Sequence, residues 1–154
     1  MRIIPAAFPA DTETVRALFR AYLDGLGLDL GFQGVEAELA DLPGKYAPPA
    51  GGVLLARDEA GRAVGVVAMW QLAPGVAEMK RLYIAPEGRG QGLGHRLVAA
   101  IVAAAREAGH ARMRLDTLAA MAPAQAIYRA AGFRPIANYN DNPLPEARHF
   151  ELIL

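Results

Sequence analysis

Residues 78–109 read EMKRLYIAPEGRGQGLGHRLVAAIVAAAREAG, and this stretch decides the fold. Its first seven residues, 78–84, have the composition of a strand, and a glycine-rich turn follows them. From Gly92 onward, apolar residues recur at the spacing of one buried helix face. They are Leu93, Leu97, Ile101, Ala105 and Ala108. The stretch therefore predicts a strand, a turn and a helix in direct succession.

The turn between this strand and this helix has the chemistry of an anion-binding site. Gly90, Gly92 and Gly94 remove side chains where the backbone would approach a ligand closely. The first turn of a helix leaves unpaired N–H groups that point outward, with the positive end of the helix dipole behind them. Arg89 adds a permanent cation whose forked donors suit phosphate oxygens. We therefore expect the turn to bind a pyrophosphate.

The flanking residues distinguish two classes of nucleotide-binding turn. A dinucleotide-binding unit would have its glycines near the start of a parallel array and an acidic residue after the next strand, and neither is apparent. Residues 89–94, RGQGLG, instead fit the pattern Arg/Gln-x-x-Gly-x-Gly and follow LYIAP at 82–86. This segment resembles the acetyl-CoA-binding motif of the GNAT family of N-acetyltransferases.

The resemblance implies that acetyl-CoA, a co-substrate, binds on both sides of the turn. A backbone N–H in the strand, most plausibly that of Leu82, would polarise the thioester carbonyl, and Ile84 would pair with the pantetheine amides. The side chains of His95 and His110 are expected at the surface. The expected acetyl-CoA-binding residues are Leu82, Tyr83, Ile84, Arg89, Gly90, Gln91, Gly92, Leu93, Gly94 and His95.

Length and composition indicate one domain, residues 1–154, with a core of its own. Hydrophobic residues make up 53% and charged residues 21%, which excludes a disordered chain. Lys plus Arg and Asp plus Glu number 16 each, so no global field would attract nucleic acid or an anionic membrane. We expect neither as a partner.

The missing cysteines exclude disulfides, thiol catalysis and cysteine metal sites, and three scattered histidines suggest no metal site. No leader-like segment or apolar run of membrane-spanning length is present, so we expect a cytoplasmic protein.

The rest of the chain supplies further strands and helices around this stretch. Before it, we predict a strand at 2–7, a helix from Asp11 to near 25, a short helix over 35–42, a surface connection at 44–52, and strands at 53–57, 63–72 and from 76. After it, we predict a strand at 111–117, a helix from Pro123 to Gly132, and strands at 133–137 and 149–154.

The order β-α-α-β-β-β-α-β-α-β-β predicts an α/β fold with a mixed sheet and helices on both faces. It resembles the GNAT fold along the whole chain. The resemblance further implies that the strand before the turn and the strand after the long helix splay apart, which opens a cleft for the pantetheine arm.

Acetyl transfer to an amine requires a neutral amine, and an alkyl ammonium is almost wholly protonated at neutral pH. Glu78 lies eleven positions before Arg89, where the histone-acetylating branch of the family carries its glutamate base. It could instead be a solvated carboxylate at a strand end, paired with Lys80 or Arg112. The sequence leaves both alternatives open.

Asp116 is the second candidate base. It falls where the branch that acetylates ribosomal-protein N-termini carries a glutamate, and its shorter side chain favours action through a bridging water. It could instead cap the following loop or pair with a neighbouring arginine.

Tyr128 is the candidate acid. The segment AQAIYRAAGF at 124–133 resembles the family's A-x-x-x-Y-x-x-x-G-F, in which the tyrosine hydroxyl faces the CoA sulfur. The alternative is an aromatic residue that only packs in the core. Many relatives have an asparagine seven residues earlier that bonds to pantetheine, and this chain has Met121 there.

The acceptor pocket is the part least determined by the sequence. The residues that could line it are Tyr22, Asp29, Phe32, Gln33, Tyr139, Asn140 and Asn142, although most could simply be turn residues. Balanced charge argues mildly against an extended basic peptide.

We therefore predict an N-acetyltransferase that moves an acetyl group from acetyl-CoA directly to the amine of a small molecule or amino-acid-like acceptor. The alternative is a catalytically silent acyl-CoA-binding or sensing domain. Tyr128 and the two carboxylates favour the enzyme. The acyl-chain preference stays open, as does a homodimer of the kind common in the family.

Overall fold

A computed structural model describes residues 1–27 and 34–154, and its elements follow the predicted order. They are β1 (Arg2–Pro5), α1 (Thr12–Leu26), α2 (Val35–Ala40), β2 (Gly52–Arg57), β3 (Ala63–Ala73), β4 (Val76–Ile84), α3 (Leu93–Glu107), β5 (Arg112–Leu118), α4 (Ala122–Ala130), β6 (Arg134–Ile136) and β7 (Ala147–Ile153). Two short 3-10 turns, η2 (Gly44–Tyr46) and η3 (Pro86–Gly88), complete the described elements. The predicted mixed α/β fold is confirmed.

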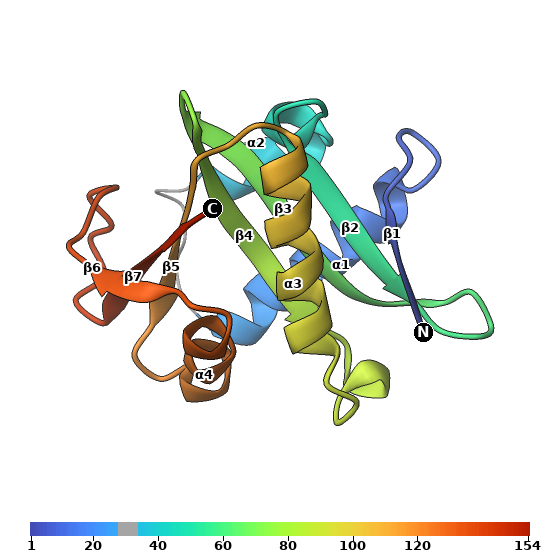
Figure 1. Ribbon diagram of the computed structural model, residues 1–154. Coiled ribbons are helices and arrows are strands. Elements are labelled where there is room, and N and C mark those ends of the chain that lie inside the picture. Colours follow the sequence, from blue (N-terminus) through green and yellow to red (C-terminus); the bar gives the residue numbers. More distant parts are fainter. Residues whose placement is uncertain (28–33) are drawn as a thin grey trace.

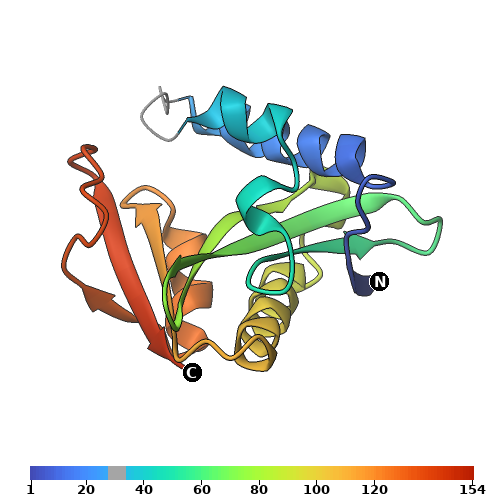
Figure 2. The ribbon, with the colours of Figure 1, turned by 90° about the horizontal axis from the view of Figure 1, so that it is seen from above.

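The seven strands form one sheet in the order β1-β2-β3-β4-β5-β7-β6. All neighbours are antiparallel except β4 and β5, which α3 joins by a crossover (Figure 1). The parallel pairing is short, because only Val76–Glu78 face Arg112–Arg114. Beyond these three pairs the two strands diverge, and the sheet is split into two halves (Figure 2).

Helices cover both faces of the sheet: α1 and α2 lie on one side, and α3 and α4 lie on the other (Figure 2). Each side has its own core. Leu97 and Ile101 of α3 are fully buried in one core, and Val15 and Phe19 of α1 in the other. The apolar face predicted for the long helix is one residue too long, because α3 ends at Glu107 and Ala108 is exposed.

The connection at 44–52 lies largely at the surface, as predicted, but it carries a buried anchor. Tyr46 is buried, with its ring 5.7 Å from that of Phe19 in an edge-on arrangement. His110, which was expected at the surface, is buried too. Because a carbonyl oxygen only accepts, Nε2 of His110 donates to the Ala50 oxygen at 2.9 Å. The connection is therefore attached to the core through Tyr46 and the Ala50 carbonyl.

Candidate active site

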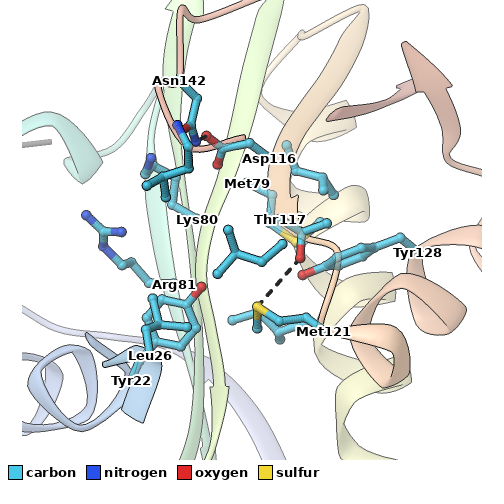
Figure 3. Close-up of a pocket in the computed structure, with 14 residues that line it drawn as sticks. Tyr22, Leu26, Met79, Lys80, Arg81, Asp116, Thr117, Met121, Tyr128 and Asn142 are labelled. Carbon is cyan, nitrogen blue, oxygen red and sulfur yellow. Dashed lines mark hydrogen bonds between the residues drawn. The ribbon is translucent and has the colours of Figure 1, made fainter. Parts of the chain in front are cut away.

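A cleft opens where β4 and β5 part. Its walls come from both strands, from α1 and α4, and from the loop before β7 (Figure 3). The lining residues are Tyr22, Leu26, Met79, Lys80, Arg81, Leu82, Leu115, Asp116, Thr117, Leu118, Met121, Tyr128, Asn142 and Leu144. Two of the three predicted catalytic residues, Tyr128 and Asp116, lie in this wall. The splayed strands that the resemblance implied are present.

β4 carries a bulge inside the cleft wall. Its register against β3 passes from Ala68–Lys80 to Val66–Tyr83, so two residues of β4, Arg81 and Leu82, occupy the space of one. Arg81 has φ +61°, in the left-handed region that side chains other than glycine rarely adopt. Such a bulge bends the strand and interrupts the ladder. It therefore marks the place where β4 can offer backbone groups to a ligand instead of to β3.

A buried ion pair holds this bulge against α2. Nε and Nη2 of Arg81 donate to the Glu38 carboxylate at 3.0 and 3.1 Å, and both side chains are more than nine-tenths buried. The Tyr46 hydroxyl donates to the same carboxylate at 2.9 Å. Burial raises the pKa of Tyr46, so its hydroxyl stays a donor at neutral pH. Glu38 thus ties α2, η2 and the bulge together.

The glycine turn has the backbone that an anion site requires. Gly90 and Gly92 have φ +79° and +68°, and Gly92 is the N-cap of α3. A glycine cap has no side chain to bond the first N–H groups of the helix, so these remain available to a ligand. Nε of Arg89 donates to the Ile84 oxygen at 3.1 Å, and residues 89–92 are all exposed.

Gly94 is a glycine for a packing reason. A Cβ at this position would lie 2.7 Å from Cδ1 of Ile127 and 3.3 Å from Cδ1 of Ile84. Leu93 and Gly94 are buried, whereas His95 is exposed as expected. The small residue lets α3 approach α4, and so fixes the distance between the turn and Tyr128.

Tyr128 lies on α4 and is buried against two aromatic rings, those of Phe133 and Phe150. Its hydroxyl points into the cleft toward Thr117 and Met121 (Figure 3). Burial, with smaller contributions from Tyr22 and Asp116, raises the pKa of Tyr128 above its usual value. The group therefore carries its proton throughout the neutral range. Met121 also lines the cleft, and its sulfur accepts from the Thr117 hydroxyl at 3.7 Å.

Asp116 is a fixed anion in the cleft wall. Its Oδ2 accepts from the side-chain amides of Asn140 and Asn142, both at 2.9 Å. Burial alone would raise its pKa, but the Lys80 charge and the two amide donors lower it below the usual value. Asp116 is therefore ionised at neutral pH, and it is not the loop cap or arginine partner considered from sequence.

Glu78 lies beside the cleft but is not among the residues that line it. It is only 2% exposed, so it is not a solvated strand-end carboxylate. Oε1 accepts from Nε1 of Trp70 at 2.8 Å, and Oε2 accepts from the Tyr139 hydroxyl at 2.5 Å. Nζ of Lys80 is 3.6 Å from Oε1, as one of the alternatives for Glu78 suggested.

His149 sets the orientation of the Asn140 amide. Because an amide oxygen only accepts, Nε2 of His149 donates to Oδ1 of Asn140 at 2.9 Å. This bond leaves the Asn140 NH₂ to face the carboxylates of Asp116 and Glu78. The loop before β7 is thereby tied to both strands at the mouth of the split.

The predicted acceptor residues fall into three groups. Tyr22 and Asn142 line the cleft, whereas Tyr139 and Asn140 lie behind it in the network of Glu78 and Asp116. Asp29, Phe32 and Gln33 lie outside the described residues.

Sequence reasoning missed five residues of this region as site components: Glu38, Trp70, Lys80, Arg81 and His149. A buried charge in an apolar strand was the available signal for Lys80 and Arg81.

Among residues 1–27 and 34–154, no group of three or more His, Cys, Asp or Glu side chains could hold a metal ion. In the same part of the chain, no helix is long and apolar enough to cross a bilayer.

Comparison with known proteins agrees with this geometry. The model of the acetyltransferase (GNAT) family matches residues 15–133. An uncharacterised N-acetyltransferase of Schizosaccharomyces pombe is 43% identical over 145 residues, which are 94% of this chain and 89% of the relative.

Two solved structures extend the comparison. A candidate acyl-CoA N-acyltransferase from Klebsiella pneumoniae has a TM-score of 0.78 at 33% identity, covering 99% of this chain and 97% of that one. A phosphinothricin acetyltransferase from Sinorhizobium meliloti, solved in complex with acetyl-CoA, has a TM-score of 0.74 at 18% identity, with 99% and 88% covered. The likeness to the second shows the fold alone. With a family model matched over most of its length and close relatives named as N-acetyltransferases, the chain is a member of the GNAT acetyltransferase family.

Proposed function

We propose that the protein transfers the acetyl group of acetyl-CoA directly to the amine of a small-molecule or amino-acid-like acceptor. The observation that carries the proposal is the cleft itself, where the bulged β4, Tyr128 and Asp116 meet beside the glycine turn. The family uses acyl-CoA donors, and the Sinorhizobium meliloti relative was solved with acetyl-CoA. Both support acetyl-CoA as the donor.

The donor would bind along β4 and the start of α3. Its pyrophosphate would accept from the first N–H groups of α3, with the Arg89 guanidinium beside it. The two glycines support this fit. Apart from the neighbouring residues in the chain, no described atom lies within 4 Å of where a Cβ on Gly90 or Gly92 would stand, so the space beside the turn is open to a ligand. The pantetheine would run from Ile84 to Leu82, with the thioester between Leu82 and Tyr128.

Transfer then needs one bond made and one broken. The amine nitrogen attacks the thioester carbonyl carbon, and the proton that it loses passes to solvent through a water that a carboxylate orients. The carbon–sulfur bond breaks, the Tyr128 hydroxyl donates its proton to the thiolate, and solvent returns a proton to Tyr128. The products are the N-acetylated acceptor and CoA. The raised pKa of Tyr128 suits this role because the acid must be protonated before each turnover.

We assign the carboxylate to Asp116 in preference to Glu78. Asp116 lines the cleft, and its Oδ1 forms no hydrogen bond to another described residue. Glu78 does not line the cleft, and each of its oxygens already accepts a hydrogen bond, from Trp70 and from Tyr139. A carboxylate of lowered pKa is a weak base, so its role is to orient a water or the amine rather than to hold a proton. Glu78 is a positioning residue, because it holds Trp70, Tyr139 and Lys80 in place.

The test is thiol release from acetyl-CoA against a panel of amino acids, polyamines, aminoglycosides and short peptides, with product masses. We expect release that depends on one acceptor class, with loss of most turnover in Asp116→Asn and a smaller loss in Glu78→Gln. A donor that binds tightly without turnover on any acceptor would favour the catalytically silent acyl-CoA-binding domain.

A further inference from the structure

One end of the cleft holds a buried ammonium with unused hydrogen-bonding capacity. The Lys80 side chain is 8% exposed and lines the cleft, and its Nζ lies 3.6 Å from Oε1 of Glu78. Within the described part of the chain this ammonium forms no closer polar contact and no hydrogen bond. An ammonium has three donors, and leaving them unbonded in a buried place is costly. The position suits a ligand that brings an anion.

Glu78 does not supply the missing bonds, because its Oε1 is 3.6 Å from Nζ of Lys80, beyond hydrogen-bond distance. Its Oε1 accepts from Trp70 at 2.8 Å, and its Oε2 accepts from Tyr139 at 2.5 Å. These two bonds hold the carboxylate in its position. Glu78 thus neutralises the charge of Lys80 but forms no hydrogen bond with its ammonium group.

The opposite charge at the same end of the cleft is Asp116, which lies near Lys80 and Asn142 (Figure 3). Asn140 and Asn142 both donate to its Oδ2, and no described residue donates to its Oδ1. The cleft therefore offers one carboxylate oxygen able to accept and one ammonium able to donate. These are the complements of an amine and of an acid group.

The ion pairs at this end balance among the described residues. Lys80 pairs with Glu78, Arg81 and Lys45 pair with Glu38, and Asp116 lies near Lys80. A polyamine would add two or more positive charges to this balance, and a diacid would add negative ones. An acceptor that carries one charge of each sign leaves the balance unchanged.

We propose that the acceptor is a zwitterionic amino acid whose carboxylate binds Lys80 and whose amine donates to Oδ1 of Asp116. This inference rests on the proposed acetyl transfer and names its substrate class. Tyr128 lines the same cleft, so an amine held at Asp116 can reach the thioester.

The first experiment compares each of the twenty amino acids with its decarboxylated amine, by thiol release and product mass. The pair differs only in the group that Lys80 would bind. We expect kcat/KM for the preferred amino acid to exceed that for its amine by about 10- to 100-fold, the range of a charge-assisted hydrogen bond. Equal rates for acid and amine would overturn the inference while leaving acetyl transfer intact.

Variants then assign the preference to Lys80. Lys80→Met should lose most of the preference by slowing the amino acid and not the amine, and Lys80→Arg should restore part of it. Lys45→Met is the matched control, because this second lysine lies 4.3 Å above the Trp70 ring and does not line the cleft. It should keep the preference. A general loss of folding would slow both substrates alike.

Calorimetric binding of acetyl-CoA separates the two hypotheses. If acetyl-CoA binds but no amino acid is bound or acetylated, the zwitterion inference fails on its own. If acetyl-CoA does not bind, the proposed function fails and the inference falls with it.

Discussion

Glu78 and Asp116 share one amide: Nδ2 of Asn140 lies 3.5 Å from Oε2 of Glu78 and 2.9 Å from Oδ2 of Asp116. The two carboxylates stand on β4 and β5, on either side of the split, and Asn140 comes from the loop before β7. That loop therefore holds the two diverging strands together at the Asp116 end of the cleft. A change in the conformation of the loop would change the hydrogen bonds that stabilise the ionised form of Asp116.

Asn142→Ala tests whether turnover requires the ionised form of Asp116. The substitution removes one of the two amide donors that stabilise the ionised form of Asp116. Loss of such a donor raises the pKa of the carboxyl, so the acidic limb of the kcat/KM profile should move to higher pH. We expect a larger move in Asn140→Ala.

Gln125→Ala is the control, because its side-chain amide donates to the backbone oxygens of Leu118 and Ala119 and not to Asp116. It should leave the limb where it is. If the acidic limb of the kcat/KM profile does not move in Asn142→Ala either, Asp116 is not the group whose ionisation the limb reports.

Tyr128→Phe should lower kcat by about 10²- to 10⁴-fold, the usual contribution of a general acid. The ring remains packed against Phe133 and Phe150, so thermal stability and acetyl-CoA binding should change little. Because the pKa of Tyr128 is raised, the wild-type enzyme should show no loss of this acid between pH 7 and 10. A thiol-release assay measures kcat across this pH range, and melting curves measure the thermal stability of the variant. An unchanged kcat in the folded variant would remove Tyr128 from the mechanism.

The element order was predictable because its signals are local. Helix periodicity and the glycine turn each lie within one short window, and the predicted strands and helices all exist. The motif around Tyr128 and the strand holding Asp116 likewise placed both residues correctly in the cleft wall.

The bulge was not predictable. Strict alternation would send the neighbours Lys80 and Arg81 to opposite faces of β4, yet both line the cleft. The bulge at Arg81 and Leu82 interrupts the alternation, and the positive φ of Arg81 has no signal in the sequence because the residue is not a glycine. The partners of Arg81 and Glu78 are also distant in sequence, by 43 residues for Glu38 and 61 for Tyr139, and short windows do not reveal such pairs.

Two glycine-to-alanine changes in helices should act in opposite directions. In Gly25→Ala the new Cβ meets no described atom within 4 Å, and the gain in helix propensity should stabilise the protein by about 0.5 kcal/mol. In Gly94→Ala it meets Ile127 at 2.7 Å, and overpacking should cost about 1 kcal/mol or more. Urea unfolding of both variants measures the difference. Gly94→Ala should in addition weaken acetyl-CoA binding, because α3 carries the anion site. Equal stabilisation by both changes would show that α3 and α4 do not pack as described.

The ion pair between Glu38 and Arg81 should matter far more than its neighbour on the same helix. Glu38→Gln leaves the buried Arg81 charge without its carboxylate and should destabilise the fold by about 3 kcal/mol, the range for a broken buried pair. Glu36→Gln is the matched control, because its ion pair with Arg20 is exposed to solvent and should leave the melting temperature unchanged.

Since Glu38 also holds the bulge that precedes Leu82, the folded fraction of Glu38→Gln should have a lower kcat than the wild type. A double-mutant cycle with Arg81→Leu isolates the pair. A coupling near zero would mean that the bulge keeps its shape without Glu38, and that its conformation is set by β3 alone.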